Sequence, residues 1–259
     1  MVWIHNWNPV LVQIGPLGIR WYSLMYVAGF LLTLYCLRRA ARAGHIRMSD
    51  EDIDVLLTGC VFGLIVGARL FAVVFWEPRY YVKHLWEVLA VWHGGLSFHG
   101  GAMGIIIAMW WFCRKRNISF LQLGDIMIVP LALGQALGRF GNFMNSELFG
   151  PPTMLWLGIN FLGESDAFGN LIFRHPTMLY EAGYNIIIFC ILSLLNKKER
   201  APGFILGNFF VSYSIFQSLT EFIRVEDVFD GPLTMGQTLN IPVFIAGVYL
   251  LLKKRRGKI

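Results

Sequence analysis

The chain has 259 residues, of which 56% are hydrophobic and only 15% are charged. A soluble domain usually carries about 25% charged residues, and the charges present here are too few to cover a water-exposed surface. The same composition excludes an intrinsically disordered chain, a collagen-like fibre and a disulfide-stapled scaffold. We therefore predict an all-α, polytopic membrane protein.

The net charge is +6, from 22 Lys and Arg against 16 Asp and Glu. Basic side chains that bind nucleic acid gather on a water-exposed face. Those of this chain form short clusters between apolar runs, as in the cytoplasmic loops of membrane proteins. We therefore expect the membrane bilayer, and no nucleic acid, among the partners.

The cysteines all lie inside apolar runs and have neither CxxC nor CxH spacing. Such residues are predicted to be buried thiols that act as small apolar side chains, with no disulfide and no metal site. They are Cys36, Cys60, Cys113 and Cys190.

Seven apolar runs follow one another along the chain, and a run needs about 20 residues to span a bilayer as a helix. Those at 126–138 and 182–195 are short, and each adjoins a polar stretch, LGRFGNFMNSE or RHPTMLYE. A short run crosses if its polar end is buried among neighbouring helices, so the chain has either five spans or seven. We favour seven transmembrane helices in one domain over residues 1–259; the other runs are 21–37, 55–76, 88–113, 201–220 and 231–252.

Most basic residues fall in alternate connections between these runs, which the positive-inside rule assigns to the cytoplasm. The N-terminus is then outside, the C-terminus is cytoplasmic and the number of crossings is odd. Residues 146–177 contain the turn-forming stretches GPPT and ESDAFGN and would form a small extracytoplasmic cap between the fourth and fifth helices. The basic residues assigned to the cytoplasm are Arg38, Arg39, Arg42, Arg47, Arg114, Lys115, Arg116, Lys197, Lys198, Arg200, Lys253, Lys254, Arg255, Arg256 and Lys258.

The stretch HGGLSFHGG places His99 just before a very apolar helix. Its glycines fit helix packing, with Gly100 and Gly104 as a small-xxx-small pair and His99 bonded to a backbone carbonyl. They also fit a catalytic role, in which His99 is a general base near neutral pH and the glycines let a substrate approach the backbone. For a lone histidine, packing is the favoured interpretation.

GRFGNFMNSELFG carries many polar side chains at a predicted helix end. Arg139 follows an apolar run and has no intrahelical acid, so it either snorkels to the outer headgroups or binds a ligand. Asn142, Asn145 and Glu147 lie within two turns of it, and such clustering is costly in a membrane unless it binds something. A guanidinium here suits a phosphate, because it is permanently charged and binds bidentately.

Glu221 and Arg224 end the sixth run with i,i+3 spacing. This spacing fits an intrahelical ion pair, and equally a second arginine that completes an anion clamp with Arg139. In the seven-helix interpretation five polar groups lie at outer helix ends, namely Tyr22 and the stretches 93–101, 138–150, 175–181 and 221–224. Polar groups that converge at one depth are typical of a binding site.

Two other features favour structural roles. In HPTMLYE, Pro176 is predicted to start a helix with His175 and Thr177 as local caps, and Tyr180 and Glu181 then lie at the mouth of that helix. Arg69 lies deep in the second run, where a charged side chain needs a partner. We expect that partner to be an acid.

The residues just described resemble those of the prolipoprotein diacylglyceryl transferase family. The resemblance extends over nearly the whole chain in the family's order, and GRFGNFMNSELFG is its specific element. It implies a seven-helix enzyme of the bacterial inner membrane with the N-terminus outside. The segments that carry it are WYSLMY at 21–26, HGGLSFHGG at 93–101, GRFGNFMNSELFG at 138–150, HPTMLYE at 175–181 and MGQTLNIP at 235–242.

The resemblance implies transfer of the diacylglyceryl group of phosphatidylglycerol to the thiol of the lipobox cysteine in a preprolipoprotein signal peptide. The product is a thioether, glycerol phosphate leaves, and no cofactor or metal is implied. By matching positions, the catalytic residues are Arg139 and Arg224, which hold the phosphate, and His99 and Tyr22, which lie near the reacting carbon and thiol. The implied substrate-binding residues are Arg139, Asn142, Asn145, Glu147, Gly150, Glu221 and Arg224.

Two other classes of protein fit the sequence less well. A lipid transporter or flippase would show charged residues at mid-membrane depth and paired broken helices, for which only Arg69 and the glycine-rich third run give a hint. An intramembrane serine hydrolase would need a GxSG-type nucleophile, and Ser97 lacks that context. Within the transferase hypothesis, either His99 or Glu147 would be the general base.

Overall fold

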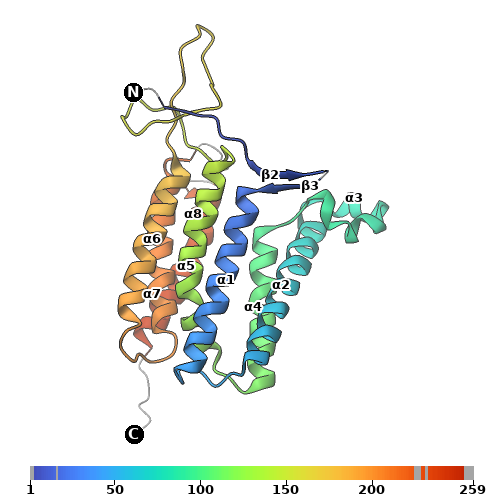
Figure 1. Ribbon diagram of the computed structural model, residues 1–259, viewed down its shortest axis with the longest axis vertical. Helices are drawn as coiled ribbons and strands as arrows, with labels where there is room; N and C mark the ends of the chain where they lie inside the picture. Colours follow the sequence, from blue (N-terminus) through green and yellow to red (C-terminus); the bar gives the residue numbers. More distant parts are fainter. Residues whose placement is uncertain (1–2, 16, 225–228, 231–232, 254–259) are drawn as a thin grey trace. The chain divides into compact units, whose positions relative to one another are not determined.

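The computed structural model describes residues 3–15, 17–224, 229–230 and 233–253, and within them the chain is mostly helical (Figure 1). The all-α prediction is confirmed at this level. The helices of 18 residues or more are α1 Trp21–Arg42, α2 Asp50–Phe71, α4 Phe98–Arg116, α5 Phe120–Met144, α6 Thr177–Leu195, α7 Phe204–Glu221 and α8 Met235–Leu252.

The other elements are short. A π-helical turn, Ala72–Trp76, extends α2 and leads into α3, Pro78–Lys83, and then into 3₁₀ turns at Leu85–Leu89 and Val91–His93. Three two-stranded sheets pair β1 with β4 in parallel, and β2 with β3 and β5 with β6 antiparallel. The strands are β1 Ile4–His5, β2 Val10–Ile14, β3 Leu17–Arg20, β4 Asn160–Phe161, β5 Phe229–Asp230 and β6 Leu233–Thr234.

By length and composition, helices able to cross a membrane are present in the described residues. They are α1, α2 with its extension to Trp76, α5 and α6, and a shorter apolar helix covers Gly236–Leu252. These helices support a membrane protein. The number of crossings and the orientation stay predictions, and the basic residues from Lys254 onward lie outside the described residues.

One of the predicted apolar runs is not a continuous helix. The run at 88–113 is not one helix, since α4 begins only at Phe98, and Gly94 and Gly95 before it have φ of 85° and 66°, which a continuous helix excludes. The short runs at 126–138 and 182–195 lie within longer helices, α5 and α6. Both helices continue into the polar motifs because their polar side chains are buried against other helices.

The chain forms two compact units, residues 37–123 and residues 1–36 with 124–259. In the first unit, α2 packs on α4 through facing glycines. A β-carbon on Gly63 would lie 2.5 Å from the carbonyl oxygen of Gly104, and Gly67 faces Gly100 in the same way. The packing interpretation of Gly100 and Gly104 is therefore confirmed, since only small residues allow the two backbones to approach this closely.

Two of the basic clusters meet at one end of this unit. Arg38 forms an ion pair with Asp54 at 3.0 Å, and Arg116 forms one with Asp52 at 2.9 Å. Asp52 also closes a capping box with Ser49 at the start of α2. The ends of α1 and α4 thus lie beside the start of α2, as their predicted location on one side of the membrane requires.

In the second unit, α5 to α8 and the first part of α1 carry the site described below. Gly29 of α1 closely approaches Gly134 of α5, and α7 contacts both α6 and α8. Figure 1 draws α1 in blue, α5 in green and α6 in orange. Asp125 caps the start of α7, because its carboxylate accepts hydrogen bonds from the backbone N–H groups of Gly203 at 2.6 Å and Leu206 at 2.7 Å.

The segment between α5 and α6 is held by polar contacts, of which one is buried. His5, fully buried in β1, donates from Nε2 to the carbonyl oxygen of Phe143 at 2.7 Å, and burial lowers the pKa of its imidazole. Arg174 donates to both carboxylate oxygens of Glu164, at 2.6 and 2.5 Å. These bonds lower the pKa of the Glu164 carboxyl and raise the pKa of the Arg174 guanidinium.

All four cysteines are free. Cys60 and Cys113 are buried and Cys36 is partly buried, but Cys190 on α6 is exposed, so the prediction of a buried thiol was wrong at that position. The apolar run around Cys190 does not distinguish a face that packs on another helix from a face left open to lipid.

The glycine contact between α2 and α4 gives a test of the packing. Gly63→Ala should lower the thermal midpoint of the detergent-solubilised protein, because its new methyl group would overlap the Gly104 carbonyl and overpacking costs about 1–3 kcal/mol. Gly59→Ala is the matched control, since a β-carbon at Gly59 would meet nothing within 4 Å. Equal midpoints for both variants would contradict the close contact.

Candidate anion-binding site

A buried carboxylate lies between two arginines in the second unit. Glu181 of α6 is 2% exposed, and its Oε2 forms an ion pair with Nε of Arg139 on α5. Its other oxygen lies 3.8 Å from Nη1 of Arg224, which follows the end of α7. Side chains from α5, α6 and the end of α7 therefore meet at one carboxylate.

The second arginine also pairs with its own helix. Nη1 of Arg224 lies 3.4 Å from Oε1 of Glu221, so the i,i+3 pair expected from the sequence is present. Only 19% of the Arg139 side chain and 17% of the Arg224 side chain are exposed. Snorkelling into the headgroups therefore does not describe Arg139, and the two arginines lie together as an anion clamp requires.

A network of uncharged groups holds Glu221 in place. Gln217 donates from Nε2 to Oε1 of Glu221 at 2.9 Å, and the Thr234 hydroxyl donates to Oε2 at 3.3 Å. Thr234 is also the N-cap of α8 and forms a capping box with Gln237. Tyr184 of α6 donates to Gln217 at 2.5 Å, so the network connects α6, α7 and α8.

The ion pair with Glu181 uses one side of the Arg139 guanidinium. Among the described residues, Glu181 is the one ion-pair partner of Arg139. It contacts Nε, so the edge formed by the two terminal nitrogens lies outside the ion pair. Two parallel N–H groups on one edge match two oxygens of a phosphate or carboxylate. The site is therefore suited to bind an anion end-on at Arg139.

The polar motif after Arg139 folds onto itself. The side-chain amides of Asn142 and Asn145 donate to the two oxygens of Glu147, at 3.2 and 3.0 Å. Glu147 is exposed, whereas Asn142 is buried. The three residues that the sequence grouped are thus together, with a carboxylate that is oriented by amides and accessible from outside.

Two glycines in this region allow close backbone contacts. Tyr22 of α1 packs against Gly141 of α5, where a β-carbon would lie 3.0 Å from Cδ2 of Tyr22, and the hydroxyls of Tyr22 and Tyr26 are hydrogen-bonded at 2.8 Å. A β-carbon on Gly150 would lie 2.6 Å from the carbonyl oxygen of Ile223. Gly150 therefore packs directly against the segment that carries Arg224.

The roles predicted for HPTMLYE need correction. The predicted helix start is confirmed, since α6 begins at Thr177 with Pro176 as its N-cap, but no side chain caps that helix. The Thr177 hydroxyl donates to the carbonyl oxygen of Leu148 at 2.6 Å, and His175 Nδ1 lies 3.2 Å from the Tyr180 hydroxyl. Glu181, predicted to be structural at the helix mouth, lies inside the arginine cluster. The sequence feature that could have indicated this location is a single acidic residue at the start of an apolar run.

His99 belongs to the other unit. It is the second residue of α4, its side chain is exposed, and its ring centroid lies 6.4 Å from that of Phe71. Ser97 precedes it as the N-cap and accepts from the backbone N–H of Gly100 at 3.4 Å. The expected proximity of His99 to the arginines stays a prediction.

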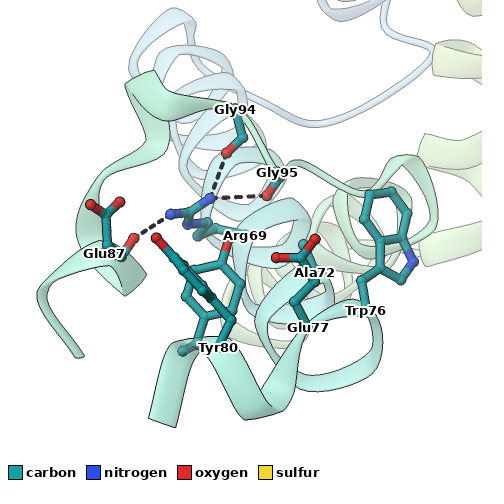
Figure 2. Close-up of a pocket in the computed structure, with 9 residues that line it drawn as sticks. Arg69, Ala72, Trp76, Glu77, Tyr80, Glu87, Gly94 and Gly95 are labelled. Carbon is teal, nitrogen blue, oxygen red and sulfur yellow. Dashed lines mark hydrogen bonds between the residues drawn. The ribbon is translucent and has the colours of Figure 1, made fainter. Parts of the chain in front are cut away.

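Arg69 is bound by carbonyl oxygens instead of the expected acid, so that prediction was wrong (Figure 2). The side chain is buried and donates to the carbonyls of Glu87, Val88, Gly94 and Gly95, and its guanidinium lies 5.0 Å from the centre of the Tyr81 ring. A pocket of about 260 Å³ adjoins it. An arginine can be satisfied in this way because its five N–H donors match several carbonyls, so Arg69 fastens the 87–95 segment to the end of α2.

Apolar helices that bring two partly buried arginines to one buried carboxylate define a helical membrane protein with a candidate anion-binding site. The chain belongs to the prolipoprotein diacylglyceryl transferase family, whose profile matches residues 9–253.

Similar proteins from three bacteria cover almost the whole chain, and each bears the name phosphatidylglycerol–prolipoprotein diacylglyceryl transferase. The one from Cupriavidus metallidurans is 40% identical over 97% of this chain and 95% of its own length. That from Rhodospirillum rubrum is 39% identical over 97% and 93%, and that from Geobacter sulfurreducens is 37% identical over 97% of each.

The contact of Thr177 gives a test of its corrected role. Thr177→Val keeps the shape of this fully buried side chain but leaves the Leu148 carbonyl without its donor, which costs about 1–3 kcal/mol of stability. Thr177→Ser keeps the hydroxyl and should lose less. Thermal unfolding of the detergent-solubilised variants measures the difference in stability. A serine variant as unstable as the valine variant would contradict a stabilising hydrogen bond from Thr177 to Leu148.

Proposed function

We propose that this chain transfers the diacylglyceryl group of phosphatidylglycerol to the thiol of the lipobox cysteine of preprolipoproteins, the first step of lipoprotein maturation. Membership of the family and the names of relatives 37–40% identical over nearly the full length support this reaction. The observation that carries the proposal in the structure is the pair of partly buried arginines around Glu181, with the terminal nitrogens of Arg139 outside its ion pair with Glu181.

In this proposal Arg139 and Arg224 bind the phosphate of phosphatidylglycerol. The sulfur attacks the glyceryl carbon that carries the phosphate ester oxygen, the C–O bond breaks, and its electron pair leaves with glycerol phosphate. The bound phosphate gains one negative charge in this step. Guanidinium groups fixed in a water-poor site stabilise charge at the place where it develops.

The thiol must lose its proton before it attacks. A free cysteine has a pKa of about 8.5, so a base or a positive field is needed near neutral pH. His99, exposed at the start of α4, and Glu147, exposed and oriented by two amides, are the two candidates for the base. Tyr22 is proposed to lie near the reacting carbon and thiol.

The remaining site residues shape the pocket. Asn142 and Asn145 orient Glu147, Glu221 orients Arg224, and Gly150 leaves room for the backbone next to Arg224. A larger residue at Gly150 would displace Ile223 and with it the arginine. These roles place all the proposed binding residues of this unit around the ends of α5, α6 and α7.

The proposal includes a topology. Seven helices cross the bacterial inner membrane, the N-terminus and residues 146–177 lie outside, and the C-terminus is cytoplasmic. Ion pairs that join the ends of α1 and α4 to the start of α2 support one shared side for the basic clusters. The site then opens toward the outer leaflet, where a lipobox cysteine is presented.

Removal of Arg139 tests the reaction. Arg139→Ala should reduce transfer of radiolabelled diacylglyceryl from phosphatidylglycerol to a lipobox peptide in membrane vesicles by about 100-fold or more, because loss of one charged donor at a developing anion has this size of effect. Arg174→Ala is the control, since Arg174 is also paired with a glutamate but lies between α5 and α6. Wild-type turnover by Arg139→Ala would refute the assignment.

His99 is tested by separating rate from binding. His99→Gln should transfer the diacylglyceryl group about 100-fold more slowly but still bind phosphatidylglycerol. Glutamine keeps hydrogen-bonding capacity but does not act as a base near neutral pH. Turnover is measured with the lipobox peptide, and binding is measured separately in nanodiscs. Full activity of His99→Gln at neutral pH would reject His99 as the base and leave Glu147.

A further inference from the structure

We infer that Glu181 is a positioning residue that aligns the two arginines and keeps the anion affinity of the site low enough for the product to leave. The inference rests on the proposed function, because it concerns how the same site handles the phosphate before and after transfer. No sequence motif pointed to this role, and Glu181 was expected to be a structural residue at a helix mouth.

The Glu181 carboxylate contacts both arginines at defined nitrogens. Glu181 meets Arg139 at Nε and meets Arg224 at Nη1, so one carboxylate fixes two guanidinium groups from different helices. This ion pair is made through Nε of Arg139, so the two terminal nitrogens lie outside it. An anion can therefore bind to Arg139 without displacing Glu181, and it meets a guanidinium whose direction is already set.

The Glu181 carboxylate is buried away from water. Glu181 is 2% exposed, so water screens its interactions with the arginines only weakly. Without it, Glu221 would be the one carboxylate that, among the described residues, forms an ion pair with either arginine. Like charges at short range in a poorly screened site repel strongly, and the arginines would separate.

The cluster of arginines and glutamates carries no net charge. Arg139, Arg224, Glu181 and Glu221 sum to zero, so the site binds an anion through directed hydrogen bonds and not through excess positive charge. The bound phosphodiester carries one negative charge, and glycerol phosphate carries up to two. A site with an excess positive charge would favour the product over the substrate, whereas the neutral cluster limits that preference.

Glu181→Gln keeps the volume of the side chain and removes its charge. Inhibition by glycerol phosphate should become about tenfold tighter, because one opposing charge is lost from a buried cluster. The KM for phosphatidylglycerol should fall, and kcat should fall about tenfold or more, because the arginines are misaligned and product leaves slowly. Glu181→Asp keeps the charge and should hold the inhibition constant near its wild-type value while kcat falls.

The experiment measures kcat, the KM for phosphatidylglycerol and the inhibition constant of glycerol phosphate, with the full-length protein in nanodiscs and a lipobox peptide as acceptor. Glu164→Gln is the matched control: it breaks a Glu–Arg pair in the segment between α5 and α6 and should leave all three values unchanged. If Glu181→Gln is not recovered folded, the inhibition constants of Glu181→Asp and wild type are compared instead, and weaker inhibition of the aspartate variant overturns the inference.

The other outcomes are distinct. Glu181→Gln with lower thermal stability but an unchanged KM and inhibition constant would make Glu181 a structural tether and overturn the inference alone. A loss of kcat with both constants unchanged would make it a general base and also overturn it. A wild-type protein that transfers nothing to the peptide would refute the proposed function, and the inference with it.

Discussion

The buried carboxylate of Glu181 is the contact on which the arrangement of the site depends. It joins Arg139 of α5 to Arg224 at the end of α7, and it does so from a third helix, α6. Charged groups away from water persist only when they are paired and hydrogen-bonded. Arg139 and Arg224 pair with Glu181, and Gln217 and Thr234 donate hydrogen bonds to the neighbouring carboxylate of Glu221. The same interaction that satisfies the charges therefore fixes the relative positions of the helix ends.

Close backbone contacts provide the second constraint, and glycine makes them possible. The facing glycines of α2 and α4 bring the helices together at the Gly63–Gly104 contact, and Gly150 lets its loop touch Ile223 beside Arg224. Arg69 acts in a related way, because it replaces a salt bridge with bonds to backbone carbonyls and so fixes the segment before His99. In both units, then, the positions of the candidate catalytic groups are set by backbone packing as much as by side chains.

The features that the sequence predicted well are those that depend on neighbours along one chain segment. The i,i+3 pair of Glu221 and Arg224 and the clustering of Asn142, Asn145 and Glu147 follow from spacing within a turn or two. The features it predicted wrongly depend on partners far away in sequence. The start of α4, the partner of Arg69 and the contacts of Thr177 all involve residues on other segments, whose approach no local pattern specifies.

The sequence by itself determined that this is a helical membrane protein of a known family, because apolar length, scarce charge and the GRFGNFMNSELFG motif are properties of the chain alone. It also pointed to Arg139 and Arg224 as a candidate anion clamp from their positions at helix ends. Only the tertiary structure decided that Glu181 lies between them and that Arg69 has no acid partner among the described residues. The physical reason is that a buried charge takes its partner from whatever packs against it, and that packing is settled only when the helices come together.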